Sequence, residues 1–132
     1  MISLEKQVVN LELSKRLKEL GVKQESYFKW VGAQLWDETQ QSDYESKSTP
    51  PRSTCIAAFT VPELGELLPP YWMLLKNIDY FRLLWWKASP EDEYQETLML
   101  RKSDYELTAD TPADCMAKML IYLVENKFVI LS

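Results

Sequence analysis

The chain has 132 residues, of which 46% are hydrophobic and 27% charged, as expected for a folded globular protein. This length suits a single domain over residues 1–132, and the absence of histidine removes the commonest general base and the commonest zinc ligand. The net charge of −5 opposes long-range attraction to nucleic acid, although a local basic face could overcome it.

The first predicted element is an amphipathic helix over residues 11–20. Its leucines repeat at helical spacing, Asn10 stands where an N-cap is expected, and Gly21 stands where a left-handed residue would end the helix. The residues that follow, Tyr27 to Val31, are aromatic or β-branched and predict a strand, which residues 34–36 continue or answer as a hairpin.

The stretch LGVKQESYFKW also resembles a helix-turn-helix, which would cover residues 12–31. In that alternative the protein is a DNA-binding regulator, and Lys23, Gln24 and Lys29 carry the DNA contacts. The strand-forming composition of the second half favours a helix followed by a strand.

The middle of the chain alternates polar loops with short elements. Residues 40–53 are polar, end in two prolines and predict a mobile loop. Thr60 stands three residues before Glu63, with Pro62 between them, which is the pattern of a capping box opening a helix that reaches about Leu68.

Three strand-like runs follow, over residues 71–76, 80–87 and 94–102, and a fourth short run covers residues 104–110. Their order and spacing predict an antiparallel meander. Thr111 and Pro112 then open a last helix, whose wide apolar face predicts that it is the most buried element. On that helix, Asp114 and Lys118 are spaced as an ion pair.

The predicted fold class is α+β, with one antiparallel sheet of about four to five strands packed with three helices. Both faces of the runs at residues 71–76 and 80–87 are apolar. Helices could cover both faces, in a helix-sheet-helix arrangement. Alternatively, an aromatic face containing Trp72, Trp85 and Trp86 could bind a protein partner or a second copy.

No catalytic, cofactor-binding or metal-binding constellation emerges. Cys55 and Cys115 lack ligand spacing, so we expect both to be reduced and buried. The five tryptophans are interleaved with Leu and Met rather than Arg and Lys, which favours a core role over nucleic-acid stacking. No apolar run approaches the roughly 18 residues of a membrane helix, and no signal peptide is recognised, so we expect a cytoplasmic protein with no membrane contact.

Three stretches, VVNLELSKRLKELGVKQESYFKWV, AAFTVPELGELLP and ADTPADCMAKMLIYLVENK, resemble segments of small uncharacterised proteins of bacterial chromosomes, prophages and mobile elements. In that family the first stretch is a helix followed by an aromatic strand. The resemblance implies a bacterial or phage cytosolic protein, and it implies no activity. The leading hypothesis is therefore a non-enzymatic accessory protein that binds itself or a macromolecule through the aromatic sheet face or through residues 40–53.

Overall fold

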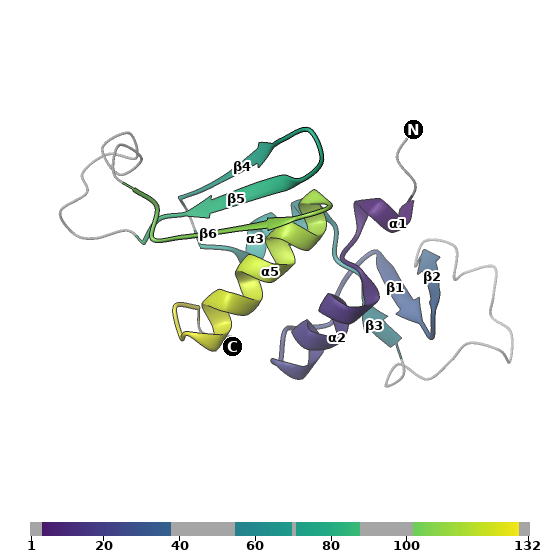
Figure 1. Ribbon diagram of the computed structural model, residues 1–132. Coiled ribbons are helices and arrows are strands. Elements are labelled where there is room, and N and C mark those ends of the chain that lie inside the picture. The colour runs from purple at the N-terminus through teal and green to yellow at the C-terminus, as the bar shows by residue number, and fades with distance from the viewer. Residues whose placement is uncertain (1–3, 38–54, 70, 88–101, 130–132) are drawn as a thin grey trace, which may run out of the picture.

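The computed structural model describes residues 4–37, 55–69, 71–87 and 102–129. Within these ranges the chain is α+β, with two three-stranded antiparallel sheets in the strand orders β2-β1-β3 and β4-β5-β6. Figure 1 shows the two sheets on opposite sides of a pair of helices, α2 and α5. The prediction of a single sheet of four to five strands was therefore wrong, because the strands divide into two separate ladders.

Two helices precede the first strand: a one-turn helix, α1 (Leu4–Gln7), and α2 (Leu11–Glu19). Asn10 caps α2 as predicted, since its side chain accepts a hydrogen bond from Leu13 N at 2.8 Å. Gly21 has a φ of 93°, and the next residue, Val22, donates from its backbone N–H to Leu17 O at 3.1 Å. This is a Schellman stop, in which buried Val22 closes over buried Leu17.

The first sheet follows directly. Strands β1 (Phe28–Val31) and β2 (Gln34–Asp37) form the predicted hairpin, and β3 (Cys55–Ala57) pairs antiparallel with the other edge of β1. The sequence interpretation did not include β3. The predicted mobile loop at residues 40–53 lies outside the described residues.

Helix α3 (Val61–Leu67) begins with the predicted capping box. Glu63 N donates to Thr60 Oγ1, and Glu63 Oε1 accepts from Thr60 N at 3.0 Å. Pro62 fits the first turn, because the N–H groups of a helix's first turn have no acceptor within the helix and the N–H that proline lacks is therefore not needed.

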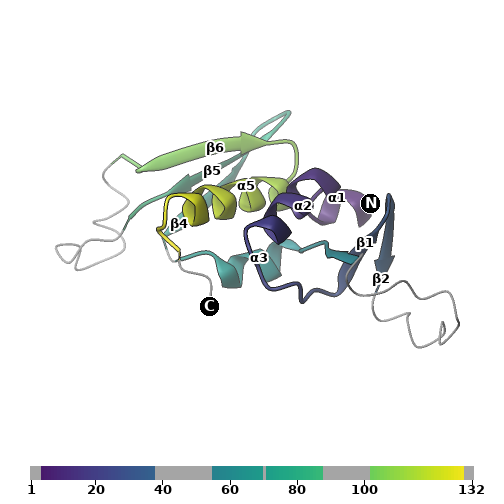
Figure 2. The same ribbon diagram turned by 90° about the horizontal axis from the view of Figure 1, so that it is seen from below.

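The second sheet is a meander of β4 (Trp72–Lys76), β5 (Phe81–Trp85) and β6 (Tyr105–Ala109). It corresponds to three of the predicted runs, while most of the run at residues 94–102 lies outside the described part. Helix α5 (Pro112–Glu125) packs on β5 and β6, and α3 packs on α5. Figures 1 and 2 show both helices on the same side of this sheet. Among the described elements the second sheet therefore has two layers rather than the helix-sheet-helix alternative.

The last helix is capped by Thr111, whose Oγ1 accepts from Asp114 N at 3.1 Å. Half of its fourteen residues are buried, so it is the centre of the main core, as predicted. The buried residues are Ala113, Cys115, Met116, Ala117, Met119, Leu120 and Leu123. A smaller cluster joins Val8, Trp30 and Ala58, so that adjacent residues Val8 and Val9 belong to different cores.

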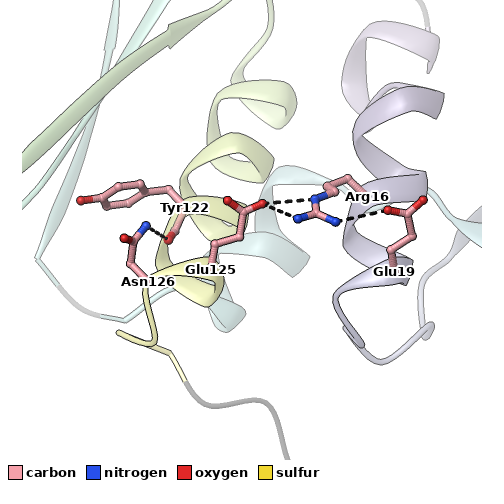
Figure 3. A network of polar contacts seen from close by, with 5 residues as sticks. All are labelled: Arg16, Glu19, Tyr122, Glu125 and Asn126. Atoms are coloured by element: carbon pink, nitrogen blue, oxygen red, sulfur yellow. Dashed lines mark hydrogen bonds and ion pairs between the residues drawn. The ribbon is translucent and has the colours of Figure 1, made fainter.

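Helices α2 and α5 are tied at both ends. At the N-terminal ends, Asp114 accepts from Asn10 N at 2.8 Å and from Asn10 Nδ2 at 3.1 Å. At the other ends, Arg16 donates to Glu125 Oε1 from Nε and from one terminal nitrogen, at 3.1 and 2.7 Å (Figure 3). The predicted pairing of Asp114 with Lys118 is absent, because Lys118 Nζ instead donates to Thr108 O at 3.2 Å.

Candidate functional site

Two surfaces of the described chain are candidate sites. The first is a groove of about 860 Å³ between the connector that follows α2, strand β3 and helix α3. Its lining residues are Gln24, Glu25, Ser26, Tyr27, Lys29, Cys55, Ala57, Pro62, Glu63 and Glu66. The groove therefore contains three carboxylates and one lysine.

The polar groups deep in the groove are engaged in structural hydrogen bonds. Ser26 is buried, and its Oγ lies 2.9 Å from Glu63 Oε1 and 3.1 Å from Ala58 O. The same Glu63 oxygen accepts from the backbone and hydroxyl of Thr60. Ser26 therefore joins the connector to the α3 capping box, and with no histidine in the chain no imidazole can activate its hydroxyl.

The groove also holds two of the three residues that the DNA-binding alternative selected. Gln24 donates to Val22 O within the connector at 2.9 Å and accepts from Ala57 N of β3 at 2.8 Å, so its amide links the connector to β3. Lys29 lies in β1, and Lys23 forms an exposed ion pair with Glu25 at 3.2 Å. A helix-turn-helix needs a second helix here, and the structure has an extended connector and strand β1 instead.

The predicted aromatic face is placed largely in the interior. Trp85 and Trp86 are 4% and 5% exposed, and half-buried Trp72 packs against the main core. In the register of the second sheet, Trp72 stands opposite Trp85 on the side that faces the helices. These three rings therefore do not form an exposed face.

The second candidate surface is the sheet side turned away from α3 and α5, together with the tip of the β4–β5 hairpin. Met73, Leu75 and Leu84 lie on that side, since they alternate with residues that pack on the helices. Arg82 and Glu106 form an ion pair beside them. Near the tip, Leu75 and Tyr80 are exposed, and Ile78 is 98% exposed. We call Met73, Leu75, Ile78, Tyr80 and Leu84 the hairpin patch.

The hairpin patch was not selected from the sequence, although one signal was present. Ile78 stands in a two-residue loop, where Asn, Asp and Gly are the usual residues. The loop is closed by a hydrogen bond from Asn77 N to Tyr80 O at 2.8 Å. A large apolar side chain held fully in water by a closed turn has no role in the monomer's core, which makes it a candidate for contact with another molecule.

The remaining chemistry of the described residues is sparse. Burial raises the pKa of the Cys115 thiol to about 11, so the thiol is protonated at neutral pH, whereas the reactive form of cysteine is the thiolate. Cys115 is buried as predicted, whereas Cys55 is only half-buried, and neither forms a disulfide. Across the four described ranges, no three His, Cys, Asp or Glu side chains are grouped as a metal site would require.

Comparison of the chain with protein-family models, with curated proteins and with solved structures gave no match. None of the helices in the described part has both the length and the apolar character to cross a membrane.

Proposed function

We propose that the protein is a non-enzymatic accessory protein that acts by binding another protein surface through the hairpin patch. The observation that carries the proposal is the exposure of Ile78, at 98%, beside exposed Leu75 and Tyr80. Six large apolar side chains of the described chain are exposed, and half of them belong to this single hairpin. Apolar and aromatic side chains gathered on one patch are what the centre of a protein interface requires.

The chemistry of the chain supports a binding role. The chain lacks histidine, its buried thiol has a raised pKa, and the serine in the groove is held by hydrogen bonds. The patch has an apolar centre with the Arg82–Glu106 pair beside it, which resembles the division of an interface into an apolar core and a polar rim. Association through such a surface removes apolar area from water. This burial contributes a favourable free energy of about 25 cal/mol per Å², from which the entropic and desolvation costs of association must be subtracted.

Photo-crosslinking in living cells that express the protein tests this proposal. A benzophenone amino acid at position 78 should give covalent adducts that contain a second polypeptide. The matched control carries the same group at Lys15, an exposed position on the polar face of α2. Equal adducts from both positions, or none from position 78, would count against the hairpin patch as a binding surface.

A further inference from the structure

The register of the second sheet determines which backbone groups of β4 remain available. Asn77 N donates to Tyr80 O, and Trp86 N donates to Tyr71 O at 3.0 Å. Because hydrogen-bonded and non-hydrogen-bonded pairs alternate in an antiparallel ladder, Met73 and Leu75 also bond to β5. The N–H and C=O groups of Trp72, Leu74 and Lys76 consequently point away from the sheet.

The edge of β3 is treated differently from the edge of β4. On β3, Gln24 Oε1 accepts from Ala57 N at 2.8 Å, and Lys18 Nζ donates to Cys55 O at 3.2 Å. Side chains thus occupy outward backbone groups of that edge. Edge strands that are left open are templates for pairing with another strand.

Within the described residues, no hydrogen bond reaches the outward backbone groups of Trp72, Leu74 or Lys76. Figure 1 shows β4 along the margin of its sheet with no described strand beyond it. The strand is five residues long and carries a single charge, on Lys76. Its edge therefore has the properties that favour addition of a strand.

We propose that β4 pairs antiparallel with β4 of a second copy of this chain, about a two-fold axis at Leu74. The proposal rests on the binding role of the hairpin patch and names its partner. In this register Leu74 faces Leu74 of the second copy, and Trp72 faces Lys76. These pairs are the ones whose backbone groups point outward, so each can exchange two hydrogen bonds. The result is a continuous six-stranded antiparallel sheet, since each copy contributes three strands.

The side chains of β4 are self-complementary in that register. On the sheet side away from the helices, Met73 faces Leu75 of the second copy, and the reverse pair repeats the contact, so half-buried and exposed apolar groups cover each other. The two lysines at position 76 lie at opposite ends of the paired strands. Like charges are therefore not placed opposite each other, and the symmetric pairing meets no repulsion at this position.

The first test uses two substitutions at position 76 to distinguish the contribution of the backbone N–H to dimer formation from that of the side chain. Lys76→Pro removes an N–H that makes no bond within the monomer, at an edge position where proline is tolerated. The control Lys76→Ala removes the same side chain and keeps the N–H. We expect sedimentation and light scattering across a wide concentration range to show a wild-type dimer. The dissociation constant should rise on the order of ten-fold or more for Lys76→Pro relative to Lys76→Ala.

The second test addresses the register. Leu75→Glu places a carboxylate opposite Met73 of the second copy and should weaken the dimer, as should Met73→Lys, which places an ammonium group opposite Leu75. When the two variants are mixed, the introduced carboxylate of one chain faces the introduced ammonium group of the other, and the second contact of the pair remains Met73 against Leu75. The mixture should therefore form a heterodimer more readily than either variant forms a homodimer. Far-UV circular dichroism of each variant confirms that the monomer stays folded.

The outcomes distinguish this inference from the proposed function. A folded wild-type protein that stays monomeric throughout overturns β4 pairing, whereas adducts to a different polypeptide from position 78 would still support the binding role. A dimer that responds equally to proline and alanine at position 76, with no recovery in the mixture, places self-association elsewhere and also overturns the inference. Adducts absent from position 78 in a confirmed β4 dimer would instead remove the role of the hairpin tip.

Discussion

At the scale of single residues, buried polar atoms are mostly matched with partners. Ser14 Oγ donates to Val9 O, Trp30 Nε1 donates to the same carbonyl at 2.9 Å, and Ser26 is bonded at the groove. Trp85 Nε1 is the exception among the described residues, since it is buried without a partner. An unmatched indole N–H costs about 1 to 3 kcal/mol, which its ring must offset by packing on the core and on Phe128.

The thiol of Cys115 gives a pH-dependent prediction. Burial raises its pKa from 9.0 in the unfolded chain to about 11 in the folded protein. Below pH 9 the thiol is protonated in both states, and between pH 9 and pH 11 the unfolded state loses the proton first. The free energy of unfolding should therefore fall across this range more steeply for the wild type than for Cys115→Ser. Denaturant titrations at several pH values measure both slopes, and parallel curves would contradict the assignment.

At the scale of elements, both long helices end with the same motif, although only one has glycine at the left-handed position. After α5, Lys127 has a φ of 62°, Lys127 N donates to Val124 O, and Phe128 N donates to Leu123 O at 2.8 Å. Gly21 occupies the equivalent place after α2. A residue with a Cβ in this conformation carries a penalty that glycine avoids.

Lys127→Gly should therefore raise the free energy of unfolding by about 1 kcal/mol. Lys127→Ala is the matched control, because it removes the same long side chain and keeps the Cβ. Equilibrium denaturation should show little change for alanine and a higher midpoint for glycine. A destabilised glycine variant would mean that the lysine side chain contributes more than the backbone strain removes.

The elements that the sequence predicted well are those defined by local chemistry. Asn10, Thr60 and Thr111 each cap the helix that follows, because an N-cap needs only a side-chain acceptor and the next turn. Strand β3 was missed because it has only three residues and its partner, β1, lies far away in the sequence, so no local pattern marks the pairing. The division into two sheets was missed for the same reason, since alternation of side chains does not state which strand is the neighbour.

The candidate site was predictable only in part. The sequence indicated that the strands around Trp72 and Trp85 were too apolar for one buried face. It could not assign the exposed face, because the choice depends on which side α3 and α5 cover. The structure turns the tryptophans inward and leaves the loop residue Ile78 outside.

At the scale of the whole molecule, the helix pair α2 and α5 lies between the two sheets and connects them. Helix α5 contacts β5 and β6 directly, while α2 contacts both α5 and β3. The hydrogen bonds of Asn10 and Arg16 to α5 hold this helix pair together at two places, so the pair links the first sheet to the second. The two sheets should therefore unfold together in one transition.

Fluorotryptophan NMR during denaturation tests this expectation, because Trp30 lies in β1 and Trp85 in β5. The two signals should share one midpoint and one slope, and far-UV circular dichroism should give the same curve. A first sheet that melts at lower denaturant, with Trp85 still in its native signal, would show that the halves are independent.

The position of α5 also matters while the protein is being synthesised. The helix follows every described strand in the chain, so the core faces of both sheets emerge from the ribosome before the element that covers the second sheet. Val8 packs with Trp30 and Ala58, and Val9 packs in the main core with Phe59, so both valines are synthesised before their partners. The core face of the second sheet therefore stays without its cover until α5, the last described element, has been synthesised, which makes closure of this core a late step on the growing chain.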